Sequence, residues 1–346
     1  MTYSLLRAGV PCLFALALIA CDQDATPEDP VTIPPDASES DVSQDVQQDD
    51  SGEDGSDDSD AVSDTSPDET AFPPVSSEPL SADTTRPAPV LLPEGFDNST
   101  EVPLVISLHG YTGNGPQNAQ YLKLAQNVTA KQFVLVTPNG TVDRFGNRFW
   151  KATDSCCGDE DSVVDDEAYL RGLIAEAKGR FNIDAGRVYL AGHSNGGFMS
   201  YRMACRASEL VTGIFSFAGA TYKKPSDCAP SQPVHVVQMH GTQDRVIQYE
   251  GGHPGGFTAI PQHPGAVETV TLWAGYNSCD ATLSDSPTGD VSGASSYTMK
   301  VQEATGCAAG GSAQLWTMEG GVHTPSFPAT LGPLILDTLF AHDRTP

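Results

Sequence analysis

The sequence predicts an α/β fold with a mostly parallel, doubly wound sheet for residues 86–346, a stretch whose length suits one domain. Short apolar segments alternate there with longer stretches whose apolar residues recur at a helical period. Segments that are apolar on both faces are typical of parallel strands covered by helices on both sides. A Gly-x-Ser-x-Gly sequence also stands between one such strand and a helix. Because open α/β sheets bind ligands at the carboxyl ends of their strands, we expect the functional site at that edge.

Six strands are expected from continuous apolar segments: Pro103–Leu108, Phe133–Thr137, Arg187–Ala191, Gly213–Ala218, Val234–Met239 and Gln314–Met318. Three helices are expected between or after them: Asp166–Phe181, Asn195–Ala207 and Thr330–Ala341. In the first helix Tyr169, Leu173 and Ala177 lie on one face. The Gly-, Pro- and His-rich stretch Gln248–Gly265 is expected to be a loop that either shapes the site or is a plain surface insertion.

Residues 1–20 have the features of a secretory signal peptide. One basic residue, Arg7, is followed by the mostly apolar stretch Ala8–Ala20, with small residues before a cleavage point. Cys21 directly after them resembles the cysteine of a bacterial lipobox. This resemblance implies cleavage before Cys21 and a diacylglyceryl group on its sulfur, so that the lipid is the only membrane attachment. The alternative is an ordinary signal peptide with an incidental cysteine. We expect an exported protein, lipid-anchored at the bacterial cell envelope or cell surface.

Residues 21–85 are expected to form a disordered acidic linker after the lipidated cysteine. Of the 45 acidic residues, 20 lie between Asp22 and Thr85, a stretch without Lys or Arg and with Phe72 as its only aromatic residue. Such a composition buries too little apolar surface to offset chain entropy, and like charges extend it. The run Asp50–Asp60 could bind calcium, but it lacks the spacing and terminal Glu of an EF-hand loop. We therefore favour a solvated spacer.

Charge and hydropathy exclude two functional classes. The formal net charge is −27, and no segment gathers Lys and Arg into the basic surface that a nucleic-acid binder needs. The only long apolar stretch is at the N-terminus, and it is too short to span a bilayer comfortably. We therefore expect that the protein has no nucleic-acid partner and that it is not a polytopic membrane protein.

The sequence Gly192–Gly196 (Gly-His-Ser-Asn-Gly) is expected to supply the nucleophile. The pattern alone is common, but between a strand and a helix it is typical of a nucleophile elbow. Such a turn strains the serine backbone, and its glycines leave room for the neighbouring strand and helix. The turn would expose Ser194 Oγ and place the Asn195 N–H at a helix N-terminus, where it can stabilise an oxyanion. The alternative is a serine in a tight turn without chemistry.

The second oxyanion donor is expected in His109–Asn114, directly after the first strand. This is where the elbow motif places that donor, and the backbone N–H of Tyr111 is the candidate. His109 is expected to support this loop by hydrogen bonds. It is not the expected base, because the base comes last in the chain order of this motif.

An acid and a base are expected after two later strands, in the order serine, acid, histidine. Asp244 in the sequence His240–Asp244 is the candidate acid, which would fix the tautomer of the base and stabilise its imidazolium. Its rivals lie in loop-like sequence: Asp280 and Asp290. His323 follows two glycines after the last strand and is the candidate base. The alternatives are a turn-capping aspartate and a solvated loop histidine.

Six motifs together resemble the α/β-hydrolase esterases that include polyhydroxybutyrate depolymerases and feruloyl esterases: HGYTGN, WKATDSCCG, SVVDDEAYL, GHSNGG, HGTQD and GGVH. The resemblance runs from about Arg86 to Phe340. It implies an α/β-hydrolase fold. It also implies a catalytic triad of Ser194, Asp244 and His323 and an oxyanion hole from Tyr111 and Asn195.

One departure from that family concerns the substrate. The family often has His-Thr-Trp-Pro after the glycines, whereas this chain has His-Thr-Pro-Ser-Phe-Pro from His323 onward. The aromatic wall beside the base is thus changed, and Phe327 is the residue that could replace it. Together with Tyr111, the further residues expected to line the substrate pocket are Trp150, His193 and Phe327.

Cysteine usage supports export. Apart from Cys12 in the signal peptide and Cys21, six cysteines remain, and an even set in an exported domain suggests disulfides. Local order favours two bridges: Cys205–Cys228 and Cys279–Cys307. Cys156 and Cys157 would then form a vicinal bridge or remain free thiols. No Cys/His spacing fits a structural zinc site, and we expect no metal and no other cofactor.

These expectations converge on a surface-tethered serine hydrolase of carboxylic esters that works through an acyl-enzyme. Its partner would be an extracellular ester, either a feruloyl- or acetyl-decorated polysaccharide or a hydroxyalkanoate polyester. The alternatives are a non-catalytic binding module on a hydrolase scaffold and a serine peptidase of the same fold. A damaged triad would favour the first, and amide turnover without ester turnover the second.

Overall fold

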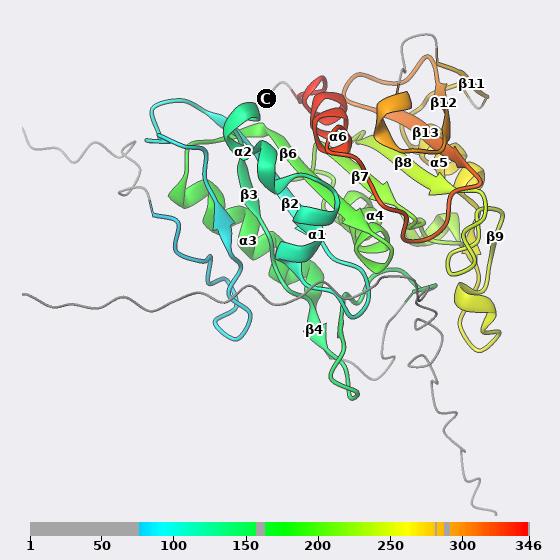
Figure 1. The fold of residues 1–346 in the computed structure, drawn as a ribbon, viewed down its shortest axis with the longest axis horizontal. Helices are drawn as coiled ribbons and strands as arrows, with labels where there is room; N and C mark the ends of the chain where they lie inside the picture. Colours follow the sequence, from blue (N-terminus) through cyan, green and yellow to red (C-terminus); the bar gives the residue numbers. More distant parts are fainter. Residues whose placement is uncertain (1–75, 157–162, 281, 287–290, 345–346) are drawn as a thin grey trace, which may run out of the picture. The chain divides into compact units, whose positions relative to one another are not determined.

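The computed structural model describes residues 76–156, 163–280, 282–286 and 291–344 (Figure 1). Its strands are β1 (Val90–Leu91), β2 (Val102–Leu108), β3 (Val134–Val136), β4 (Thr141–Val142), β5 (Arg148–Phe149), β6 (Ile183–His193), β7 (Gly213–Phe217), β8 (His235–Gly241), β9 (Gly251–Gly252), β10 (His263–Pro264), β11 (Leu283–Asp285), β12 (Thr298–Ala304) and β13 (Ser312–Glu319). Its α-helices are α1 (Gly115–Tyr121), α2 (Val128–Lys131), α3 (Asp166–Arg180), α4 (Asn195–Arg206), α5 (Ala266–Tyr276) and α6 (Leu331–Phe340). The expected signal peptide, the lipidated Cys21 and most of the expected linker lie outside the described residues. Among those described, no helix is long and apolar enough to cross a bilayer.

Nine strands form one sheet in the order β1-β3-β2-β6-β7-β8-β13-β12-β11. All neighbours from β3 to β13 pair in parallel. The pairs at the two edges, β1 with β3, β13 with β12 and β12 with β11, are antiparallel. The mostly parallel sheet expected from the sequence is therefore confirmed. The strand order reverses between β2 and β6, and a crevice opens at such a point outside the carboxyl ends of the strands.

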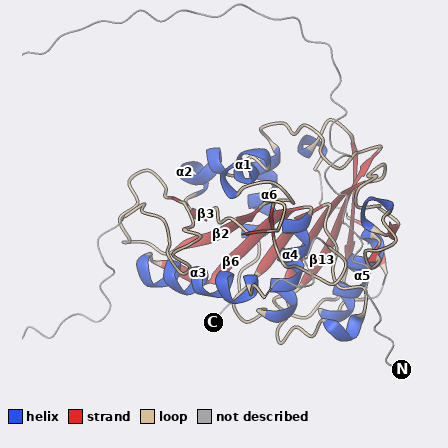
Figure 2. Cartoon of the chain, turned by 90° about the horizontal axis from the view of Figure 1, so that it is seen from below, coloured by secondary structure: helices blue, strands red, loops and turns tan. Residues whose placement is uncertain are grey.

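Helices cover both faces of this sheet. Side chains of α3, α4 and α5 enter one apolar core, and those of α1, α2 and α6 enter the other. Figure 2 shows α1 and α2 on one side of the strands and α3 and α5 on the opposite side. Along β2, Leu104 and Ile106 face the first core and Val105 faces the second. The central strands are thus buried on both sides, which explains their continuous apolar sequence.

The predicted strands and helices are present with ends displaced by a few residues, but other elements were not predicted, among them β11, β12 and α5. Strand β6 begins at Ile183 instead of Arg187. The antiparallel strands β11 and β12 were missed because half-exposed antiparallel strands lack a continuous apolar run. Helix α5 was missed because it directly follows a Gly-rich loop and contains β-branched residues, which have a lower helix propensity.

The folded part begins upstream of the predicted linker boundary at Thr85, which corrects that prediction. Leu80 is fully buried and forms a β-bridge with Ala88. The backbone N–H of Ser81 donates to the carboxylate of Glu176 on α3 at 2.8 Å. These contacts offset the entropy lost on ordering this segment, and its acidic composition gives no sign of them.

The two disulfides expected from local order are present among the described residues: Cys205–Cys228 and Cys279–Cys307. Cys156 is disulfide-bonded as well. Cys157, expected either as its partner or as a free thiol, lies outside the described residues. Disulfides are typical of proteins that fold in an oxidising compartment.

Candidate active site

Ser194 stands in a sharp turn between β6 and α4. Its φ of 52° and ψ of −121° lie in a region that is strained for any residue with a side chain. A Cβ on Gly192 would lie 2.1 Å from the carbonyl oxygen of Gly196, and a Cβ on Gly196 would lie 2.0 Å from that of Leu108. Strand, turn and helix therefore pack too closely for larger residues at these two positions. The turn has the geometry expected of a nucleophile elbow.

Three predicted side chains meet at this turn. His323 Nε2 lies 3.0 Å from Ser194 Oγ, and His323 Nδ1 lies 2.7 Å from Asp244 Oδ2. The serine follows β6, the aspartate follows β8 and the histidine follows β13. All three side chains therefore lie at the carboxyl ends of strands of one sheet. With Nδ1–H donating to the carboxylate, Nε2 is left to accept from the serine hydroxyl. The arrangement can move a proton from Ser194 to His323.

Asp244 is buried and held on both carboxylate oxygens. Oδ1 accepts from the backbone N–H groups of Val246 and Ile247 at 2.8 and 2.9 Å. Oδ2 faces His323 and, at 3.4 Å, Nε2 of His240. Burial acts to raise the pKa of Asp244, but hydrogen bonds from His240 and His323 outweigh it and hold the pKa well below its usual range. The ionised carboxylate can stabilise positive charge on His323.

His240 is the site residue to which the sequence analysis gave no role. Its ring is buried, with Nε2 2.7 Å from the carbonyl oxygen of Ile247 and Nδ1 3.1 Å from Nε2 of Gln238. Because an amide nitrogen only donates, Nδ1 accepts, and Nε2 carries a proton that it donates to the carbonyl of Ile247, whose own N–H donates to Asp244. His240 therefore orients the acid. The signal was available, since His240 lies four residues before Asp244 in the same motif.

The two expected oxyanion donors lie on neighbouring segments at the point where the strand order reverses. The backbone N–H of Asn195 opens α4, and no described group accepts a hydrogen bond from it. The N–H of Ser194 is engaged with the carbonyl of Phe217 at 2.8 Å. Tyr111 lies in the loop after β2, where the next residue, Thr112, has a φ of 69° and bonds a carbonyl of β5. Because β2 and β6 are adjacent, both donors lie at one edge of the sheet.

His109 supports the Tyr111 loop, as the sequence predicted. Its Nε2 accepts from the backbone N–H of Gly140 at 2.9 Å, and its Nδ1 lies 2.7 Å from the carbonyl oxygen of Gly110. Burial lowers the pKa of His109 to about 4, so the ring is neutral at neutral pH. The neutral ring ties the loop after β2 to the loop after β3.

Trp150 does not line an open pocket, which corrects the prediction for this residue. Its side chain is fully buried, and its indole N–H donates to the carbonyl of His109 at 3.0 Å. The backbone N–H and C=O of Trp150 bond the side-chain amide of Asn195 at 2.6 and 2.9 Å. Through these bonds Trp150 connects Asn195, at the start of α4, to His109, in the segment that leads to Tyr111. A buried tryptophan needs a partner for its N–H, and here that requirement gives it a structural role.

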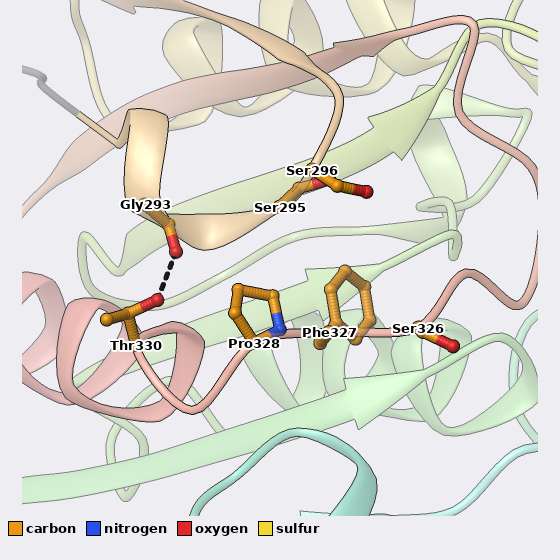
Figure 3. A pocket seen from close by; sticks show the side chains of 7 residues that line it. All are labelled: Gly293, Ser295, Ser296, Ser326, Phe327, Pro328 and Thr330. Carbon is orange, nitrogen blue, oxygen red and sulfur yellow. Dashed lines mark hydrogen bonds between the residues drawn. The ribbon is translucent and has the colours of Figure 1, made fainter.

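His193 and Phe327, the other predicted pocket residues, belong to one aromatic cluster with Tyr121 and Phe217. The ring centroids of neighbours in this cluster are 5.0 to 5.2 Å apart. Phe327 also borders an open depression with a volume of about 480 Å³ (Figure 3). The other residues that line the depression are mostly hydroxyl-bearing: Gly293, Ser295, Ser296, Ser326, Pro328 and Thr330. Phe327 thus provides an aromatic surface a few residues from the candidate base.

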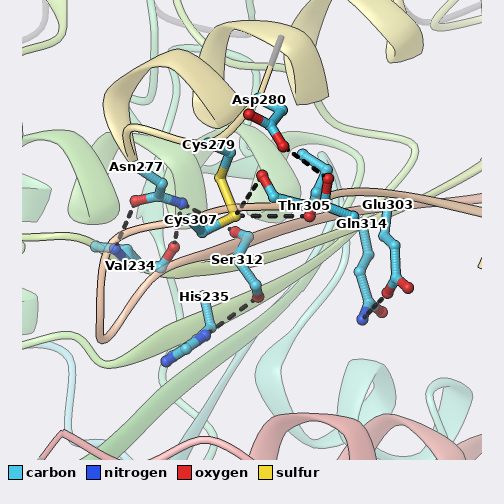
Figure 4. Close-up of a disulfide and its surroundings, with 11 residues drawn as sticks. Val234, His235, Asn277, Cys279, Asp280, Glu303, Thr305, Cys307, Ser312 and Gln314 are labelled. Carbon is cyan, nitrogen blue, oxygen red and sulfur yellow. Dashed lines mark hydrogen bonds between the residues drawn. A yellow bond between two sulfur atoms is a disulfide. The ribbon is translucent and has the colours of Figure 1, made fainter. Parts of the chain in front are cut away.

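The rival residue Asp280 lies away from the relay. Asp280 bonds Thr305 beside the Cys279–Cys307 disulfide, near the starts of β8 and β13 (Figure 4). Asp290 lies outside the described residues. Within the ranges that the structure describes, no group of three or more His, Cys, Asp or Glu side chains is arranged to hold a metal ion.

Comparison with known proteins gives the chain a family. The family model described as "Putative esterase" matches residues 81–289. The chain is 29% identical over 197 residues to Feruloyl esterase B of Piromyces equi. This alignment covers 55% of this chain and 35% of that protein. It is 25% identical over 168 residues to "Probable feruloyl esterase C" of Aspergillus terreus, covering 46% and 56%. The match thus spans about a third to just over half of the length of these relatives.

A solved structure supports the fold assignment. The acetyl xylan esterase from Aspergillus awamori aligns with a TM-score of 0.52 at 14% identity, over 74% of this chain and 94% of that one. At this identity the likeness concerns the fold alone. Since the family model matches residues 81–289, which are more than half of the chain and include Ser194 and Asp244, the protein belongs to this esterase family and has its α/β-hydrolase fold.

Proposed function

We propose that this protein is a serine hydrolase of carboxylic esters that forms an acyl-enzyme on Ser194. The observation that carries the proposal is the continuous relay from Ser194 through His323 to Asp244, with contacts of 3.0 and 2.7 Å. The strained serine backbone adds support, because such strain persists where the surrounding structure imposes it and clusters at functional sites. Family membership gives the reaction class, ester hydrolysis.

In the first half of the reaction Ser194 Oγ attacks the ester carbonyl carbon while His323 Nε2 takes the hydroxyl proton. The carbonyl oxygen becomes an oxyanion, which the N–H groups of Asn195 and Tyr111 stabilise, each by roughly 3 kcal/mol. Asp244 stabilises the imidazolium and holds its tautomer. His323 then gives the proton to the alcohol oxygen as the carbon–oxygen bond breaks, and the acyl group stays on Ser194.

The second half repeats these steps with water. His323 Nε2 takes a proton from a water molecule, whose oxygen attacks the acyl carbon and forms a second oxyanion. When this intermediate collapses, the bond to Ser194 Oγ breaks and His323 returns the proton to Oγ. A carboxylic acid leaves, and the site is restored without any cofactor.

The substrate we propose is an acyl-decorated polysaccharide that carries feruloyl or acetyl esters. The support is the names of two proteins that are similar in sequence, both feruloyl esterases. A hydroxyalkanoate polyester is the other ester class to be tested.

We further propose that the protein is exported and held at the bacterial cell envelope or cell surface through a lipid on Cys21. The sequence around Cys21 motivates the anchor, and the disulfides suit an oxidising compartment. Mass spectrometry of the protein from membranes tests this proposal. A diacylated N-terminal Cys21 is expected, and an intact residue 1–21 segment would refute it.

The activity is tested with the purified full chain on p-nitrophenyl acetate, methyl ferulate, acetylated xylan, hydroxybutyrate oligomers and a p-nitroanilide amide. We expect ester turnover by the wild type and none above background by Ser194→Ala. Equal inactivity of both on every ester would favour a binding module, and turnover of the amide alone would favour a peptidase. Hydrolysis of only the hydroxybutyrate oligomers would reassign the substrate to polyesters.

A further inference from the structure

The candidate base lies in a segment without regular secondary structure. Strand β13 ends at Glu319 and α6 begins at Leu331, and His323 lies between them. Such a segment has no regular backbone hydrogen bonds of its own. Other groups must therefore fix the imidazole to within a fraction of an ångström of a productive position. The contacts of this segment therefore decide how well the relay is formed.

The acid loop holds the upstream part of the segment. The backbone N–H of Gln243 donates to the carbonyl of Gly321 at 2.9 Å, and the backbone N–H of Gly320 donates to Thr242 Oγ1 at 2.8 Å. These bonds end two residues before His323. They fix the segment to the loop that carries the acid but not to the turn that carries the serine.

Two side chains hold the segment from His323 onward. Nε2 of His193 lies 3.1 Å from the carbonyl oxygen of His323, and the hydroxyl of Tyr121 donates to the carbonyl of Pro325 at 3.1 Å. A carbonyl only accepts, so Nε2 of His193 carries a proton. The two donors come from separate elements, because His193 ends β6 and Tyr121 ends α1.

His193 connects the nucleophile elbow to the segment that carries His323. It directly precedes Ser194, and its ring stacks on Phe217 with centroids 5.0 Å apart and planes 16° apart. The loop of the second oxyanion donor lies against the same ring, since a Cβ on Gly110 would be 3.3 Å from His193 Nδ1. The ring of Tyr121 packs on it at 5.1 Å. The donor to His323 is thus immobilised relative to the serine hydroxyl.

We propose that His193 and Tyr121 are positioning residues, whose two hydrogen bonds hold the base segment against the nucleophile elbow and so set the distance between His323 Nε2 and Ser194 Oγ. The inference rests on the proposed ester hydrolysis. Neither residue is assigned a contact with the reacting atoms, so both act through His323. This replaces the substrate-binding role expected for His193.

The protonation state of His193 agrees with this role. Burial, together with the nearby His323, lowers the pKa of His193 to about 3. The ring is therefore neutral at neutral pH. The ring centroids of His193 and His323 are 5.0 Å apart, so a charged His193 would oppose the imidazolium that forms on His323, and the neutral ring does not. A neutral donor can hold the base without opposing its protonation.

The test uses His193→Phe, which keeps a stacking ring but loses the donor, and His193→Gln, which keeps an N–H donor. Two readouts are kcat and KM for p-nitrophenyl acetate and the rate at which a fluorophosphonate labels Ser194. We expect His193→Phe to lower kcat and the labelling rate by about 10- to 100-fold with little change in KM, as small misplacements of catalytic groups do. His193→Gln should recover most of this loss.

Tyr121→Phe removes a single oxygen atom and is the variant least able to disturb folding. We expect a loss of about 3- to 10-fold in kcat, smaller because its bond lies two residues beyond the base. Its matched control is Tyr276→Phe, which removes an equivalent bond to the carbonyl of Pro225 at 3.1 Å on another part of the molecule. The control should match the wild type in both readouts.

The outcomes separate the inference from the function on which it rests. If the wild type neither turns over esters nor reacts with the fluorophosphonate, the proposed function fails. If the wild type is active and both His193→Phe and Tyr121→Phe keep its kcat and labelling rate, the positioning role is wrong. A loss in His193→Phe that His193→Gln does not recover, accompanied by an equal fall in the melting temperature of both, would also overturn it.

Discussion

The two ends of the central strands differ in what their residues do. At the carboxyl ends lie the relay, the strained Ser194 and the loops that are tied to each other by side-chain hydrogen bonds. At the amino ends lie the Cys279–Cys307 disulfide and the side chain of Asn277, which bonds both Val234 and Ser312 (Figure 4). The strained nucleophile thus lies at one end, and the Cys279–Cys307 bridge and the hydrogen bonds of Asn277 lie at the other.

Arg344 adds further hydrogen bonds at the amino ends of the central strands. Its guanidinium donates to three backbone carbonyls, those of Ser208, Val211 and Pro233, at 2.7 to 2.9 Å. These residues belong to the connections that lead into β7 and β8. The strained turn at Ser194 lies at the opposite end, where hydrogen bonds to Phe217 and from Phe198 hold it. Substitutions at the carboxyl ends should therefore change catalysis, and those at the amino ends should change stability.

The largest effect is expected for Ser194→Ala. Without the hydroxyl no acyl-enzyme forms, and kcat on p-nitrophenyl acetate should fall by about 10⁴-fold or more. The melting temperature should stay close to that of the wild type, because the substitution removes a single oxygen atom. If Ser194→Ala kept a tenth of the wild-type kcat, Ser194 would not be the nucleophile.

A loss of about 10³- to 10⁴-fold in kcat is expected for Asp244→Asn, since an amide in place of the carboxylate favours the wrong tautomer of His323. The amide also loses the negative charge that stabilises the imidazolium. Steady-state kinetics with the same ester check this, alongside the conservative Asp244→Glu. Wild-type rates in Asp244→Asn would show that another group orients the base.

At the amino ends, replacing both Cys279 and Cys307 by serine should lower the free energy of unfolding by about 3 kcal/mol, because the bridge closes a loop between residues 28 positions apart. Urea unfolding under non-reducing conditions measures the change. The kcat of the folded variant should equal that of the wild type. A loss of kcat without a loss of stability would contradict the division between the two ends.

The smallest effect concerns His235, the first residue of β8. Burial, with the charges of His342 and Arg344, lowers its pKa to about 3. The unfolded chain takes up a proton near pH 6.5 and the folded chain does not, so His235 makes stability fall as the pH drops from 6.5 toward 3. Between pH 7 and 5 this amounts to about 2 kcal/mol.

His235→Gln should therefore flatten the dependence of unfolding free energy on pH over that range, with kcat at pH 7 unchanged. Urea unfolding of both proteins at several pH values is the measurement. The other buried histidines, including His109 and His193, make the wild-type curve steeper still, so the comparison rests on the difference between the two proteins. Parallel curves would show that His235 does not titrate differently on folding.

Several features could be predicted because they depend on local order. The elbow at Ser194 needs only a strand, a turn with small residues and a helix in succession. The acid and base follow strand ends in a fixed chain order, and the disulfides join neighbouring cysteines. Other features could not be predicted, because their partners are far away in sequence. Trp150 is one example, since its burial depends on His109 and on Asn195, 45 residues later.

The sequence by itself determined the class of fold, the edge of the sheet where the site lies and the three side chains of the relay, because apolar periodicity and turn chemistry act over a few residues. Only the tertiary structure decided how the base is held. The donors to its segment, His193 and Tyr121, are 130 and 204 residues from the carbonyls they bond. Contacts of that range form only when strands distant in sequence become neighbours in the sheet, and no local pattern encodes them.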